Sequence, residues 1–192
     1  MMERIAEGSP SPRAPRARTT GLVYLLYFLT AAFGEFLGSR KLVVYGDVVN
    51  VIGVGFYVAL TVLFYLLFKP VNRSVSLLAA FFSLVGCVLT VLSLFDLVPS
   101  RSPLAFFGPY CMLIGYLIFR STFLPRVLGV LMVLAGLGWL AFLSPSLAKH
   151  LSPYIQVVGV LAEGLLMLWL LVKGVNEQRW KEQARVLSKG NS

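Results

Sequence analysis

Residues 153–172 read PYIQVVGVLAEGLLMLWLLV, a run in which only Gln156 and Glu163 are strongly polar. An α-helix rises about 1.5 Å per residue, so roughly 20 apolar residues cover the ~30 Å hydrocarbon core of a bilayer. This run therefore predicts a transmembrane helix.

Five more apolar runs precede it, at about residues 20–38, 49–68, 74–98, 103–119 and 126–143. The segments between them, such as KPVNRS and RSTFLPR, carry prolines and charges where a helix must stop. In hydrocarbon the backbone groups of each run must be hydrogen-bonded internally, which requires helices. The sequence thus predicts an all-α, polytopic bundle of six transmembrane helices within residues 20–173.

The composition supports this class. The 192 residues are 58% hydrophobic and 13% charged, more apolar than the average soluble domain. The net charge of +9 lies almost wholly in the tails and in the short segments between the apolar runs. Since no basic stretch is long enough to build a continuous positive face, we expect the lipid bilayer and not nucleic acid as the partner.

The distribution of basic residues predicts the topology. Of the 17 Lys and Arg residues, 13 lie in the N-terminal tail (residues 1–19), in the segments 69–74 and 120–126, and in the C-terminal end from Lys173 onward. The other four are Arg40, Lys41, Arg101 and Lys149. By the positive-inside rule both termini are expected in the cytoplasm, as in a multi-pass protein of the cell (inner) membrane.

Both tails are basic. Residues 1–19 have the composition of a flexible tail. In the basic cytoplasmic tail, residues 174–192, Trp180, Ala184 and Leu187 share one helical face among basic residues, which predicts a short helix on an anionic membrane surface.

Small and aromatic residues predict packing and anchoring. Close helix packing is expected at the GxxxG pair Gly34 and Gly38, at Gly55 with Ala59, and at Gly129, Gly136 and Gly138. Aromatic side chains near the ends of the runs are candidate interfacial anchors: Tyr45, Tyr65, Tyr110, Trp139 and Tyr154.

Glu163 is the strongest candidate functional residue, because an ionisable group at the middle of a span costs about 2.5–3.5 kcal/mol on insertion. Gln156, Gly159, Glu163 and Met167 follow one another at helical spacings of three and four residues, so they share one stripe. This stripe is expected to face protein or water instead of lipid.

Glu35 and Asp96 lie near the outer ends of the first and third runs, with Asp47 on the same side. If the first, third and sixth helices are neighbours, Glu35, Asp96 and Glu163 line an outward-facing polar cavity that binds a proton or a ligand. The alternatives are that Glu35 and Asp96 are ordinary boundary charges, and that Glu163 is a protonated, hydrogen-bonded structural group.

Catalytic and metal-binding motifs are absent from the sequence, which favours a protein that is not an enzyme. His150 is the only imidazole, so a multi-histidine metal site is excluded, and whether the protein binds a cofactor is unknown from the sequence. Cys87 and Cys111 lie inside apolar runs and are expected to be buried, unreactive thiols.

Several strings in the chain resemble a bacterial membrane family known as domain of unknown function 4386. They are GLVYLLYFLTAAFGEF (21–36), KLVVYGD (41–47), KPVNRS with the following LLAAFF, GYLIFRSTFLPRVLGVLMVLAGLGWL (115–140) and LWLLVKGVNEQRW (168–180). The resemblance extends from residue 20 to about 182; it implies six helices and no particular activity. The chain departs from the family pattern after Asp47, where the segment before the second helix is shorter, and a ligand site built from that segment would be reduced here.

Three functions fit these observations. The first is a small transporter or carrier that binds a proton or cationic group at Glu163. Because six helices are few for one transport unit, this function predicts a homo-oligomer. The second is a non-catalytic membrane subunit or lipid-binding protein, whose protein partner the sequence does not identify. The third is an intramembrane enzyme acting on a lipid or isoprenoid.

Overall fold

The structure is a computed structural model that describes residues 17–99, 103–141 and 143–189. These residues form seven helices and no strand, which confirms the all-α prediction. The helices are α1 (Ala17–Ser39), α2 (Val43–Phe68), α3 (Arg73–Leu94), α4 (Leu104–Arg120), α5 (Arg126–Ala141), α6 (Pro145–Val172) and α7 (Glu177–Lys189).

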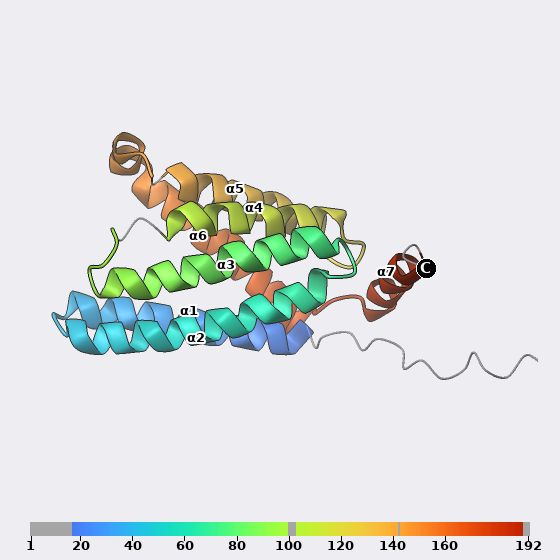
Figure 1. Cartoon of the computed structure of the whole chain (residues 1–192), viewed down its shortest axis with the longest axis horizontal. Coiled ribbons are helices and arrows are strands. Elements are labelled where there is room, and N and C mark those ends of the chain that lie inside the picture. The colour runs from blue at the N-terminus through green and yellow to red at the C-terminus, as the bar shows by residue number, and fades with distance from the viewer. Residues whose placement is uncertain (1–16, 100–102, 142, 190–192) are drawn as a thin grey trace, which may run out of the picture.

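The first six helices form a closed ring. Each packs against its neighbour in sequence, and α1 packs against α6 to complete the circle. The connections are short, so neighbouring helices run antiparallel, and α7 lies at the end of the bundle that also holds the start of α1 (Figure 1). Because the ring is closed, every one of these six helices has one face toward a common interior.

Within the described residues, four helices are long and apolar enough to cross a membrane: α1, α2, α3 and the Tyr154–Val172 part of α6. The other two apolar helices of the ring are shorter, with 17 residues in α4 and 16 in α5. Helix length therefore supports four of the six predicted spans, as expected for an integral membrane protein.

Helix α3 ends earlier than the apolar run predicts. Leu97 N–H donates to Leu92 O and Asp96 N–H to Ser93 O, while Asp96 has a φ of 56°. This is the Schellman ending, in which a left-handed residue follows the helix and satisfies its last carbonyls. Asp96 is therefore an exposed residue beyond α3, and its predicted place inside the third helix is wrong.

Glycines allow α4 and α5 to approach closely. A Cβ on Gly115 would lie 2.6 Å from the backbone oxygen of Gly129, and one on Gly136 would lie 2.6 Å from that of Gly108. The expected packing roles of Gly129 and Gly136 are thus confirmed. Gly55 has no neighbouring heavy atom within 4 Å, so the expectation that it packs within the bundle is wrong.

Helix α7 folds back onto one end of the ring. Trp180 is buried, and its indole Nε1–H donates to the backbone oxygen of Leu67 at 2.9 Å. Leu67 lies in the last turn of α2, where carbonyls have no partner within the helix. Trp180 therefore packs on protein and not on lipid, in contrast to the membrane-surface helix expected from the sequence.

Candidate functional site

Glu163 lies at the midpoint of the apolar segment Tyr154–Val172 of α6. The hydroxyl group of Tyr24 in α1 donates a hydrogen bond to its Oε2 at 2.8 Å. Trp139 of α5 is a second hydrogen-bond partner of the same carboxyl group. The carboxyl group is therefore held from both helices that flank α6 in the ring.

Both partners are fixed by packing. Tyr24 is buried, and its ring centroid lies 5.3 Å from that of Phe28 and 5.8 Å from that of Phe64. The indole of Trp139 lies against Gly159, where a Cβ would come within 2.6 Å of Cζ2. Gly159 precedes Glu163 by one helical turn, so the bare backbone at this position lets the indole lie beside the carboxyl group.

A cavity of about 260 Å³ lies next to Glu163, and all six helices of the ring contribute to it. Among the described residues of its lining, Glu163 is the only acid, and there is no Lys, Arg or His. The lining consists of Tyr27, Tyr57, Thr90, Ser93, Pro103, Leu104, Phe107, Trp139 and Glu163. This cavity, named here the central cavity, combines one acid with aromatic rings and hydroxyl groups.

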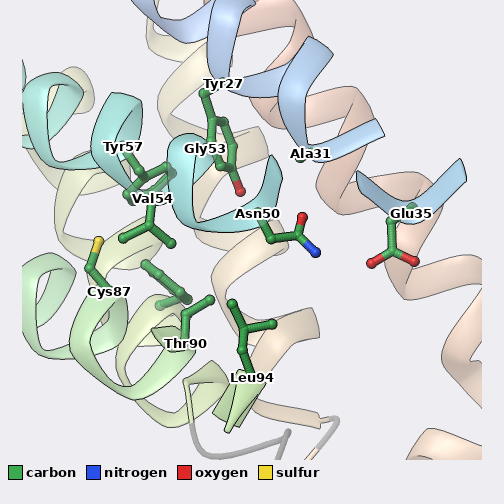
Figure 2. Close-up of a pocket in the computed structure, with 11 residues that line it drawn as sticks. Tyr27, Ala31, Glu35, Asn50, Gly53, Val54, Tyr57, Cys87, Thr90 and Leu94 are labelled. Atoms are coloured by element: carbon green, nitrogen blue, oxygen red, sulfur yellow. The ribbon is translucent and has the colours of Figure 1, made fainter. Parts of the chain in front are cut away.

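A second cavity of similar volume adjoins it and contains Glu35 and Asn50 (Figure 2). The two cavities share four lining residues, namely Tyr27, Tyr57, Thr90 and Phe107. In Figure 2 Glu35 lies at one edge of this outer cavity, away from Tyr57 and Cys87. The aromatic side chains therefore separate an inner space at Glu163 from an outer space at Glu35.

The structure brings together only part of the predicted site. Glu163 and Glu35 line adjoining cavities, and Gly159 and Met167 face the interior as the stripe predicts. Gln156 and Asp96 are exposed and line neither cavity. Asp47 lies inside α2, which begins earlier than expected.

The expected proximity of the first, third and sixth helices holds in part. Helix α1 packs against α6, whereas α3 packs against α2 and α4. Thr90 and Ser93 of α3 nevertheless line the central cavity with Glu163. In place of Asp96, α3 contributes hydroxyl groups.

The sequence pattern did not predict the aromatic residues of the site. Tyr24 and Tyr27 are three residues apart in α1, a spacing that places both on one face, and this was the available signal. Trp139 lines the cavity and Tyr110 is buried, so their assignment as interfacial anchors is wrong. Tyr45 and Tyr154 are exposed, as anchors must be.

Metal and thiol chemistry find no support in the described part of the chain. No group of three or more His, Cys, Asp or Glu side chains could hold a metal ion there. Cys87 and Cys111 are free and buried.

A closed ring of apolar helices around a cavity with one central carboxyl group defines a helical membrane protein with a candidate ligand site. The chain belongs to the family described as "Domain of unknown function (DUF4386)", whose profile matches residues 39–99 and 101–174. The resemblance found in the sequence is thereby confirmed.

One relative is an uncharacterised protein of Archaeoglobus fulgidus. It is 31% identical over 127 residues, which cover 61% of this chain and 76% of the relative. No solved structure matches the chain.

Proposed function

We propose that this protein is a small multi-pass carrier of the cell (inner) membrane, in which Glu163 binds a proton or a cationic group of the solute. One observation carries the proposal: six helices surround a cavity in which Glu163, at the middle of α6, is the only acidic or basic side chain among the described lining residues. Ionisable residues at such a depth are rare, and they commonly mark ion or substrate pathways.

The proposal includes six spans. At about 1.5 Å per residue, α4 and α5 are roughly 25 Å long, somewhat less than the ~30 Å hydrocarbon core. They belong to the same ring as the four longer helices, and a bilayer accommodates a short span by local thinning, at a fraction of a kcal/mol per Å. With six spans that alternate in direction, both ends of the chain lie on the same side of the membrane.

The charge distribution supports the orientation. Lys69, Arg73, Arg120 and Arg126 lie near the end of the ring that α7 covers, and α7 is itself basic. Among the described side chains at the opposite end, the basic ones are Arg40, Lys41 and His150. By the positive-inside rule, the end with α7 faces the cytoplasm.

Charge compensation supplies the coupling in this carrier. An unpaired carboxylate at the middle of a membrane is costly, so Glu163 is stable when it holds either a proton or a cation. Binding of the cationic solute therefore releases the proton, and departure of the solute requires a proton to return. The carrier exchanges one for the other, and Tyr24 keeps Oε2 in place through both states.

The test is solute uptake into proteoliposomes that contain the purified full chain. An acidic interior should drive uptake of a cationic solute and discharge the pH gradient, which a pH-sensitive dye inside the vesicles reports. Glu163→Gln should abolish both signals. Asp96→Asn is the matched control, because Asp96 is exposed outside the cavity and Asn tolerates its left-handed backbone. Coupled uptake that persists in Glu163→Gln would reject the proposal.

A second candidate is a non-catalytic membrane subunit in which Glu163 is a structural group. The hydrogen bond from Tyr24 favours it, because this bond joins α1 to α6 where the ring closes. In that case Glu163→Gln retains the hydrogen bond, and the only change expected is in stability. The vesicle experiment separates the two candidates.

A further inference from the structure

We propose that the central cavity binds a small organic ammonium ion, with its charge at Glu163 and its alkyl groups among Tyr27, Tyr57, Phe107 and Trp139. As the solute of the carrier, this ligand rests on the proposed function. Its binding is a property of the cavity and can be measured without transport.

The charge of the lining selects a cation. Among the described residues, nine line the central cavity, and they include one carboxyl group and no Lys, Arg or His. An anion in this space would find no positive side chain among the described lining residues, so its charge would stay uncompensated in a medium of low dielectric constant. A neutral apolar ligand would leave Glu163 with its proton and would gain no charge-assisted contact from the carboxyl group.

The hydroxyl groups of Thr90 and Ser93 favour a ligand that donates hydrogen bonds. Thr90 Oγ1 donates to the backbone oxygen of Gly86 at 2.9 Å, and Ser93 Oγ donates to that of Thr90 at 2.8 Å. Each hydroxyl group has a single proton, so both oxygens can offer the cavity only lone pairs. With Glu163, the polar groups of α3 and α6 therefore accept hydrogen bonds, as the N–H groups of an ammonium ion require.

The aromatic rings select an organic cation. The ring centroids of Tyr27 and Tyr57 are 4.7 Å apart, and those of Tyr57 and Phe107 are 5.2 Å apart. Together with Trp139 they make four of the nine lining residues aromatic. A cation near an aromatic face gains about 0.5–2 kcal/mol, and Trp is the best partner. A bare metal ion would instead need several oxygen ligands, which rings do not supply.

The cavity volume limits the size of the ligand. Water occupies ~30 Å³ per molecule in the liquid, so 260 Å³ holds about eight or nine groups of that size. The outer cavity shares four lining residues with the central cavity, and Glu35 at its edge favours the approach of cations. The dimensions therefore fit an alkylammonium ion of a few carbon atoms.

The experiment is calorimetric titration of the full chain in lipid nanodiscs at neutral pH. The probes are butylammonium, its uncharged analogue butanol, and sodium ion. Butylammonium should bind at least about tenfold more tightly than butanol, the difference that a single charge-assisted contact or cation–π contact supplies. Sodium at the same concentration should not displace it.

Variants locate the binding. Glu163→Gln should weaken butylammonium binding at least about tenfold, and Trp139→Leu should weaken it several-fold, while Trp139→Phe keeps much of the affinity. Asp96→Asn should bind like the wild type. Each variant is first required to match the wild type in thermal unfolding; if Trp139→Leu fails this requirement, the comparison of Glu163→Gln with Asp96→Asn locates the site.

The outcomes separate the two proposals. Equal binding of butanol and butylammonium, displacement by sodium, or full affinity in Glu163→Gln would overturn the ammonium site. Butylammonium binding without any coupled uptake would support the ligand class and reject the carrier. Proton-linked uptake in a chain that binds no alkylammonium would support the carrier and overturn the ligand class.

Discussion

Tyr24 and Glu163 are 139 positions apart in the sequence, and the tyrosine hydroxyl group donates to the carboxylate Oε2 at 2.8 Å. The bond lies at the contact of α1 with α6, where the ring of helices closes. The bond therefore links the candidate ligand site to the contact between α1 and α6 that closes the ring.

The first prediction concerns the energy of this bond. Tyr24→Phe removes the donor and keeps the ring, so it should lower the stability by about 0.6–1.7 kcal/mol, the range measured for hydrogen bonds between membrane helices. The measurement is a double-mutant cycle with Glu163→Leu, using unfolding in mixed micelles. Because each single change removes the same bond, the two effects should be less than additive; strictly additive effects would show that the bond contributes nothing.

The second prediction concerns the approach of α4 to α5. Gly115→Ala places a methyl group against the backbone of Gly129 and should destabilise the protein by about 1–3 kcal/mol, as overpacking does. The thermal midpoint in detergent measures this loss. Gly55→Ala is the control, since open space surrounds Gly55 and alanine favours the helix. Equal stability of the two variants would contradict the close packing.

The third prediction concerns the position of Trp139. Gly159→Ala adds a Cβ that collides with the indole, so Trp139 must move away from Glu163. In a background with Trp169→Phe and Trp180→Phe, the fluorescence maximum of the remaining indole should shift. Gly164→Ala, at a position with no neighbour within 4 Å, should leave the emission unchanged. Identical spectra in both variants would contradict the contact.

The fourth prediction concerns the docking of α7. Trp180→Ala removes a buried side chain and the hydrogen bond to Leu67, a loss that in protein cores costs about 3–5 kcal/mol. Trypsin should then cleave at Arg179 and Lys181 at least tens of times faster, because the helix opens more often. Mass spectrometry of the digested chain gives the rates.

The control for this digestion is Val186→Ala, because Val186 lies on α7 with 73% of its surface exposed. Its cleavage rate should stay near that of the wild type. If Trp180→Ala is cleaved no faster than Val186→Ala, α7 is not held by Trp180.

Of the candidate site, only the acidic residue could be predicted from the sequence. Glu163 stands out because one acid interrupts a long apolar run, and its cost in lipid is a property of that residue and its depth. Tyr24, Tyr57 and Thr90 carry no comparable signal, since tyrosine and threonine are ordinary in apolar helices. The sequence left open whether Asp96 lines the cavity or is an ordinary boundary charge, and the Schellman ending of α3 places it beyond the helix, exposed.

By itself, the sequence determined the helical class, the apolar character of the chain, the family and the acid at the middle of α6. These features follow from transfer of residues to hydrocarbon and from local hydrogen bonding, which act segment by segment and add along the chain. The tertiary structure alone decided that α1 meets α6, that Trp139 lies on Gly159, and that Trp180 covers the end of α2. Such contacts depend on surfaces that are far apart in sequence and fit only in three dimensions, so no local pattern records them.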